Sequence, residues 1–112
     1  ELKKNLIEIL IKLKKENKSI FGYGAPAKGN VLLNYCEIDT KFLDYVIDTT
    51  PLKQGKYTPG MHIPIIAPSN LNNEDVALLL AWNYESEILL KEKMFRNNGG
   101  KFLIPVPNPI IK

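Results

Sequence analysis

The stretch Ile20-Phe21-Gly22-Tyr23-Gly24-Ala25-Pro26-Ala27-Lys28-Gly29-Asn30 is the strongest fold signal in the chain. Its apolar start belongs to an expected strand over 19–23, and its end opens an expected helix over 27–36. Gly22 and Gly24 tolerate positive φ and leave room for a close ligand, and Pro26 suits a first helical turn. A helix N-terminus beneath a glycine-rich turn offers free N–H groups and the positive end of a dipole, so this junction predicts a phosphate or nucleotide site.

The spacing of this loop departs from two common phosphate-binding motifs. A dinucleotide fingerprint has its third glycine three residues after the second. After Gly24 that position would be 27, whereas the next glycine in this chain is Gly29. A P-loop has Ser or Thr after Gly-Lys, whereas this chain reads Lys28-Gly29-Asn30, which argues against an NTPase. A tight turn that binds nothing stays open as the alternative. The candidate ligand contacts in the loop are Gly22, Tyr23, Gly24, Ala25, Pro26, Lys28, Gly29 and Asn30.

Length and composition limit the class of protein. The 112 residues suffice for one domain with its own core. The net charge of +3 permits an anionic ligand, but the basic residues are not clustered as nucleic-acid binding requires. The single cysteine, Cys36, excludes an internal disulfide and a cysteine-cluster metal site, and we expect it to be a small apolar residue near a helix end. Without a long apolar run or a signal peptide, we predict a cytoplasmic protein with no membrane or nucleic-acid partner.

The first segment reads as an amphipathic helix that ends at about Asn17. Leucine and isoleucine recur at helical spacing from Leu2 to Leu13, and lysines occupy the other faces. We expect this helix to cover one face of a sheet, and binding to a membrane or a partner is the alternative. Because it begins at Glu1 with no initiator Met and no capping residue before it, we expect the chain to be a fragment of a longer one.

A second strand is predicted over 42–48, where aromatic and β-branched residues suit a buried parallel strand. Asp48 stands at its carboxyl end, where Rossmann-type folds place an acid that accepts from a ribose hydroxyl. Capping of a turn is the alternative role for this aspartate. The connection over 49–64 is long, and its apolar residues and prolines favour a fixed path over disorder. Its candidate donors to a phosphorylated ligand are Lys53, Lys56, Tyr57 and His62, of which His62 is also a candidate acid or base.

The second half alternates short apolar runs with one helical segment. We expect a short strand over 65–67, a capped turn over 69–71 and a strand buried on both faces over 76–81. Asn83 is expected to cap a helix that runs to about Asn98, and it is a further candidate ligand contact. A last strand is expected over 101–106, after which the prolines at 105, 107 and 109 end the fold.

Together these segments predict an α/β fold, a Rossmann-like three-layer sandwich over residues 1–112 with a mainly parallel sheet of about five strands flanked by helices. Ligands of such sheets bind outside the carboxyl ends of the strands. Residues 22–30, 48–62 and 82–83 all lie at that edge, which favours nucleotide or phosphate binding.

Several stretches, in order and over nearly the whole chain, resemble the C-terminal domain of S-adenosylmethionine-dependent sugar C-methyltransferases. They are Gly-Tyr-Gly-Ala-Pro-Ala-Lys-Gly-Asn (22–30), Leu-Leu-Asn-Tyr-Cys (32–36), Pro-Leu-Lys-Gln-Gly-Lys-Tyr-Thr-Pro-Gly-Met-His-Ile-Pro (51–64), Leu-Leu-Ala-Trp-Asn (79–83) and Gly-Gly-Lys-Phe-Leu-Ile-Pro-Val-Pro (99–107). The family loop often has Thr where this chain has Val31, which leaves out a possible hydroxyl contact.

The resemblance implies an enzyme that methylates carbon 3 of keto-deoxysugars carried on nucleoside diphosphates. It implies an N-terminal zinc domain and a central domain that binds S-adenosylmethionine, both outside this chain, and it makes the central domain a partner of this one. No cofactor and no catalytic residue are expected in this chain, and the implied ligand is a nucleoside-diphosphate sugar. The alternatives are a stand-alone Rossmann-type domain for a nucleotide, dinucleotide or coenzyme A, and a domain that only packs against a catalytic one.

Overall fold

The computed structural model describes residues 1–68, 71 and 75–112, and within them six strands form one sheet in the order β3-β2-β1-β4-β5-β6. The strands are β1 (Ile20–Tyr23), β2 (Val46–Ile47), β3 (Ile65–Ile66), β4 (Val76–Leu79), β5 (Lys101–Ile104) and β6 (Ile110–Ile111). All neighbouring strands are parallel except β5 and β6. The predicted α/β fold with a mainly parallel sheet is therefore confirmed, with one strand more than expected.

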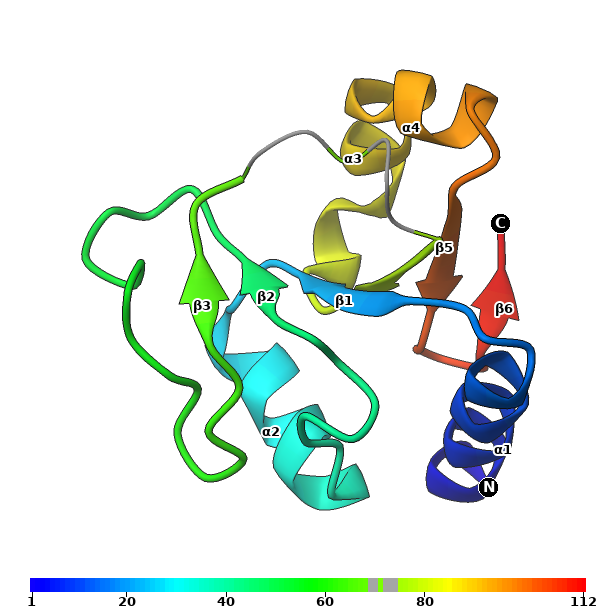
Figure 1. Cartoon of the computed structure of the whole chain (residues 1–112), viewed down its shortest axis with the longest axis horizontal. Helices are drawn as coiled ribbons and strands as arrows, with labels where there is room; N and C mark the ends of the chain where they lie inside the picture. Colours follow the sequence, from blue (N-terminus) through cyan, green and yellow to red (C-terminus); the bar gives the residue numbers. More distant parts are fainter. Residues whose placement is uncertain (69–70, 72–74) are drawn as a thin grey trace.

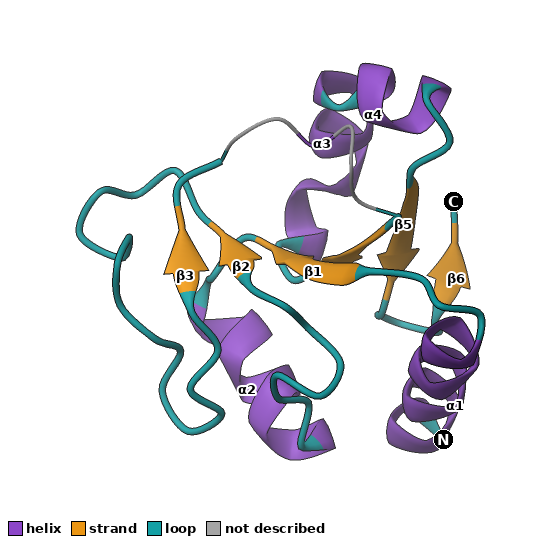
Figure 2. Cartoon of the chain, viewed as in Figure 1, coloured by secondary structure: helices purple, strands orange, loops and turns teal. Residues whose placement is uncertain are grey.

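Helices cover both faces of this sheet (Figures 1 and 2). Helices α1 (Leu2–Lys15) and α2 (Ala27–Cys36) lie on one face, and α3 (Glu85–Lys91) and α4 (Lys93–Asn97) lie on the other. This arrangement gives the three layers that the sequence predicts.

The buried side of α1 shows why this helix belongs to the sheet. Leu6 and Leu10 are fully buried and Leu13 nearly so, and they pack with Leu33 of α2 in one core cluster. Burial of one such leucine contributes about 1.5–3 kcal/mol. The predicted role of the helix as a cover over one face is confirmed. No helix in the described ranges is long and apolar enough to cross a membrane.

The two cores follow the period of two along the central strands. In β4, Val76 and Leu78 face the α1–α2 side, whereas Ala77 and Leu79 face the α3–α4 side. Successive side chains of a strand point to opposite faces, so a continuous apolar run suits a strand covered on both sides. Cys36, at the end of α2, is buried in the first core, as expected.

The second strand is shorter than predicted, because β2 covers only Val46 and Ile47, although the main chain at 44, 45 and 48 also hydrogen-bonds to β1 and β3. Further back, residues 39–43 form a turn, in which the N–H groups of Phe42 and Leu43 donate to the Asp39 carbonyl. Leu43 is fully buried in the core on the α1–α2 side, so burial rather than pairing accounts for its apolar character.

The helix predicted over 83–98 is divided, and Asn83 does not cap it. Residues Trp82–Tyr84 form a 3₁₀ turn, so α3 begins only at Glu85 with Tyr84 in the capping position. Glu92 then leaves helical geometry, with φ of −100° and ψ of 30°, and separates α3 from α4.

The predicted place of Pro26 in the first turn of α2 is wrong, because Pro26 lies before this helix with extended geometry (ψ 163°).

The prediction that the prolines after β5 end the fold is wrong, because a further strand, β6, follows them. The chain turns back at 105–109, and β6 pairs antiparallel with β5, extended by two hydrogen bonds between Phe102 and Lys112. A strand of two residues carries too little pattern to be recognised from sequence. The predicted turn over 69–71 lies outside the described residues except for Leu71, which is buried on the α3–α4 side.

Candidate functional site

The glycine loop lies at the carboxyl end of β1, where the strand order reverses between β1 and β4. Open α/β sheets bind ligands at this switch point. Gly24 has φ of +88°, so a side chain there would be strained, and a Cβ would lie 3.0 Å from the Ala81 Cβ. At Gly29 a Cβ would lie 2.8 Å from the Leu80 Cβ, so this glycine lets α2 pack closely on the end of β4.

Asp48 ties the glycine loop to the end of β2. One carboxylate oxygen accepts from the N–H of Ala25 at 2.8 Å, and the other accepts from the N–H of Thr50 at 2.8 Å. Burial alone raises the pKa of Asp48. The hydrogen bonds from Thr50 and Ala25 and the charge of Lys53 outweigh that effect and lower the pKa below its ordinary value. The carboxylate is therefore an ionised acceptor that holds the loop.

Lys53 completes this contact from the other side of Ala25. Its ammonium donates to the Ala25 carbonyl at 2.8 Å and lies 4.0 Å from the Asp48 carboxylate. Both main-chain polar groups of Ala25 are thus held by the segment that follows β2. The Lys53 side chain remains 42% exposed, so it also faces solvent beside the loop.

A cleft of about 460 Å³ opens between the glycine loop, the end of β2 and α3, and we call it the sheet-edge cleft. Its charged side chains are Asp48, Lys53, Glu87, Lys91 and Glu92. The α3 side of the cleft comes from positions 84, 87, 88 and 91, which share one helix face. This helical spacing could have indicated from the sequence that these residues share one surface, but the sequence predictions did not use it.

Tyr23 and Glu92 form a polar pair inside this cleft. The Tyr23 hydroxyl donates a hydrogen bond to the carboxylate of Glu92, the residue between α3 and α4. Burial, the hydrogen bond and the negative charge of Glu92 raise the pKa of Tyr23 well above its ordinary value. The phenol is therefore a hydrogen-bond donor at neutral pH and not a base.

A second cavity, of about 660 Å³, lies between α2 and the 49–64 loop, and we call it the α2–loop cavity. It adjoins the sheet-edge cleft, because Ala25, Pro26 and Lys53 line both. Exposed apolar side chains line it as well, namely Val31, Leu52 and Tyr57.

The loop that forms this wall follows a fixed path, as the sequence predicts. Thr58 is buried and pairs with Ile63 twice: its N–H donates to the Ile63 carbonyl, and its hydroxyl accepts from the Ile63 N–H. The Asn34 side chain of α2 donates to the Pro59 carbonyl at 3.1 Å. The loop is therefore tied both to itself and to α2.

The predicted contacts are not all brought together. Tyr23, Gly24 and Asp48 line the sheet-edge cleft, Asn30 and Tyr57 line the α2–loop cavity, and Ala25, Pro26 and Lys53 line both. Lys28 and Asn83 meet at a smaller hollow of about 150 Å³ beside the end of β4. Gly22 and Gly29 are buried packing positions.

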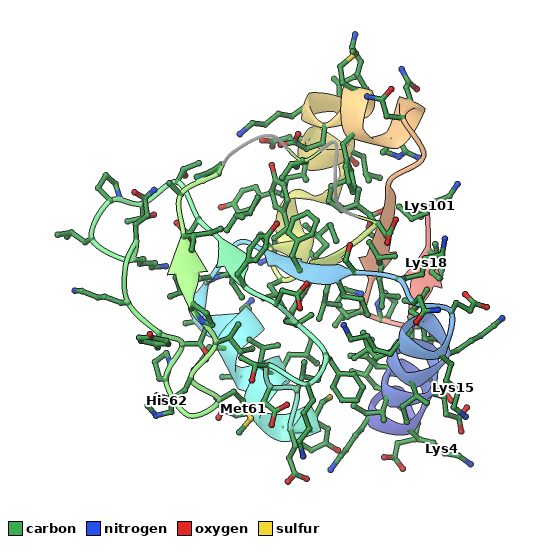
Figure 3. The ribbon with its side chains drawn as sticks, viewed as in Figure 1. Lys4, Lys15, Lys18, Met61, His62 and Lys101 are labelled. Carbon is green, nitrogen blue, oxygen red and sulfur yellow. The ribbon has the colours of Figure 1, made fainter. Side chains whose placement is uncertain are left out.

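His62 stands apart from these cavities. Figure 3 shows it beside Met61 in the turn at the far end of the 49–64 loop, and it lines neither the sheet-edge cleft nor the α2–loop cavity. Its ring centroid lies 6.4 Å from that of Tyr57, and it takes a left-handed φ of 55°. The lysines labelled in Figure 3 (Lys4, Lys15, Lys18 and Lys101) lie on the α1 side of the view.

Residues 1–107 match the family described as the C-methyltransferase C-terminal domain. The chain belongs to this family. It is also similar to the C-methyltransferase NovU from Streptomyces niveus, with 47% identity over 96 residues. That match covers 84% of this chain but only 23% of NovU, so the chain spans about a quarter of the relative's length. The resemblance inferred from the sequence is thus confirmed at the level of a C-methyltransferase C-terminal domain.

Proposed function

We propose that this chain is the nucleotide-sugar-binding domain of an S-adenosylmethionine-dependent C-methyltransferase that acts on nucleoside-diphosphate keto-deoxysugars. The observation that carries the proposal is the pair of adjoining cavities that share Ala25, Pro26 and Lys53. They flank the glycine loop at the N-terminus of α2, which is suited to a phosphate group between two larger groups. Membership in the C-methyltransferase family supports a methyl-accepting substrate.

We propose further that the chain is not catalytic on its own. A general base works best with a pKa near the operating pH. In the sheet-edge cleft the pKa of Asp48 is lowered and that of Tyr23 is raised, so both are moved away from that range. Asp48 and Tyr23 thus suit binding and positioning better than proton transfer.

Among the residues that the structure describes, we find no set suited to the cofactors that the sequence resemblance implies. In the part of the chain that the structure describes, no three His, Cys, Asp or Glu side chains lie together as zinc ligands do. The acid at the end of β2, Asp48, is turned onto the N–H groups of Ala25 and Thr50. These features support binding of zinc and S-adenosylmethionine elsewhere in the parent enzyme.

The strand order favours one alternative, a dinucleotide-binding domain, because dinucleotide-binding sheets have the same order. Against it stands the placement of the Asp48 carboxylate: both of its oxygens accept main-chain hydrogen bonds and its side chain is only 11% exposed, which leaves little access for a ribose.

Calorimetric titration of the 112-residue chain with a thymidine-diphosphate sugar tests the proposal, with S-adenosylmethionine and NAD as controls. We expect heat of binding with the sugar nucleotide alone. Binding of NAD in place of the sugar nucleotide would establish the alternative, and no binding by any of the three would leave a packing domain. Methyl transfer catalysed by this chain alone would overturn the non-catalytic role.

A further inference from the structure

The two cavities differ in charge, and this difference assigns the parts of the ligand. The sheet-edge cleft has three carboxylates, those of Asp48, Glu87 and Glu92, against two lysines. The α2–loop cavity has Lys53 and Lys56 and no acidic side chain in its lining. A diphosphate is therefore repelled less and attracted more on the α2–loop side.

Two apolar side chains of the α2–loop cavity are exposed to solvent and could contact a flat ring such as a nucleobase. Leu52 is 80% exposed and Tyr57 is 61% exposed, although both line a concave surface. A large exposed aromatic side chain offers a stacking surface for a nucleobase at low cost in conformational entropy.

The wall that carries Tyr57 is held by contacts within the chain itself. The Ile65 N–H donates to the Lys56 carbonyl, Tyr57 forms a bridge with Pro64, and Thr58 is buried and paired. A rigid wall lowers the ordering cost of binding, so exposed side chains on it can contribute most of their contact energy.

One residue in the lining of the α2–loop cavity, Asn30, has an unsatisfied side-chain polar atom. The side-chain oxygen of Asn30, which lines the cavity, is buried and has no hydrogen-bond partner among the described residues. Buried polar groups without partners are uncommon in native proteins and call for an explanation. Rotation of this amide toward the cavity would give a bound base a polar partner.

We infer that the nucleotide half of the ligand binds in the α2–loop cavity, with its base against Tyr57 and its diphosphate beside Lys53 and Lys56, and that the sugar lies in the sheet-edge cleft. This inference rests on the proposed function and adds the orientation of the ligand. The hydroxyl-rich sugar then meets the carboxylates of Glu87 and Glu92, which accept hydrogen bonds from hydroxyl groups.

The test is a calorimetric titration with thymidine diphosphate, which lacks the sugar, and with the thymidine-diphosphate sugar. Tyr57→Ala is expected to weaken thymidine diphosphate roughly tenfold, as loss of a base–aromatic stack does. Its matched control is Tyr35→Ala, because Tyr35 is equally exposed (60%) on α2 and lines neither cavity.

A second pair of variants tests the charge argument. Lys56→Gln is expected to weaken thymidine diphosphate and to reduce the dependence of its affinity on salt, whereas Lys41→Gln, an exposed lysine outside both cavities, leaves both unchanged. Glu87→Gln is expected to weaken only the sugar nucleotide.

The outcomes separate this inference from the proposed function. If both ligands bind and Glu87→Gln alters the affinity for thymidine diphosphate while Tyr57→Ala and Lys56→Gln do not, the orientation is wrong and the proposed function stands. If neither ligand binds the unmodified chain, both fail. Because Tyr57, Lys56 and Glu87 are exposed, the variants are expected to fold, which circular dichroism checks.

Discussion

The carboxylate of Asp48 accepts a hydrogen bond from the main-chain N–H of Ala25 at 2.8 Å, and this bond joins the end of β2 to the glycine loop. The same carboxylate accepts from the N–H of Thr50. Its lowered pKa is the electrostatic consequence of these contacts, which are stronger with the ionised form.

Asp48→Asn is expected to lower the free energy of unfolding by about 1–3 kcal/mol at pH 7, because an amide must turn a donor toward one of the two N–H groups. The folded pKa of Asp48 is below its unfolded value of about 3.9, so its contribution is complete above that value. The contribution is lost as the pH falls through the lower, folded pKa.

Urea unfolding of the wild type and of Asp48→Asn at several pH values between 7 and 2 measures this effect. The difference between the two proteins should shrink as the pH falls below about 4. A difference that stays constant over this range would show that the charge of Asp48 plays no part.

Gly29→Ala is expected to destabilise the protein by about 1–3 kcal/mol, since the added methyl would lie 2.8 Å from the Leu80 Cβ and 3.0 Å from its carbonyl oxygen. In a helix without this contact the same change stabilises by about 0.5–1 kcal/mol. Urea unfolding of Gly29→Ala and the wild type distinguishes these two effects: a lower midpoint for the variant shows that the contact with Leu80 dominates, and a higher midpoint shows that helix propensity dominates. Lys28→Ala, at the neighbouring exposed position, serves as the control and should change stability little.

Thr58→Val should cost about 1–3 kcal/mol, because it keeps the shape of the side chain but leaves the buried N–H of Ile63 without its acceptor. We expect the Ile63 amide to exchange faster with deuterium. Thr58→Ser retains the hydroxyl and should keep that amide protected. Equal exchange in all three proteins would mean that the hydroxyl does not hold the loop.

Tyr23→Phe is expected to reduce stability by about 0.5–1.5 kcal/mol at pH 7 through loss of the hydrogen bond to Glu92. The folded pKa of Tyr23 lies above that of the unfolded chain, about 10. Its contribution is therefore complete below pH 10 and is lost as the pH rises through the folded pKa.

Thermal unfolding of both proteins from pH 7 to 11 checks the Tyr23 prediction. The wild type should lose more stability than Tyr23→Phe above pH 10, and parallel curves would contradict the raised pKa.

Much of the fold is predictable because burial is periodic in this chain. The continuous apolar run of β4 follows from a strand covered on both faces, and the helical spacing of Leu6, Leu10 and Leu13 follows from a helix covered on one face. The helix break at Glu92 and the strand β6 were missed, since neither has a local pattern. The predicted contacts Tyr23, Asp48 and Lys53 do converge on one cleft, but the pairing of Tyr23 with Glu92 and of Asp48 with Ala25 was not foreseen.

The amino-acid sequence by itself determined the layers of the fold, the glycine loop at the end of the first strand and the family of the chain. These features depend on residues that are near one another in the sequence, or on which face of a helix or strand carries the apolar side chains. The tertiary structure alone decided that Asp48 and Lys53 clamp Ala25, and that two adjoining cavities divide the charges unequally. Such contacts join residues 23 and 28 positions apart, and their geometry follows from how the strands and loops pack.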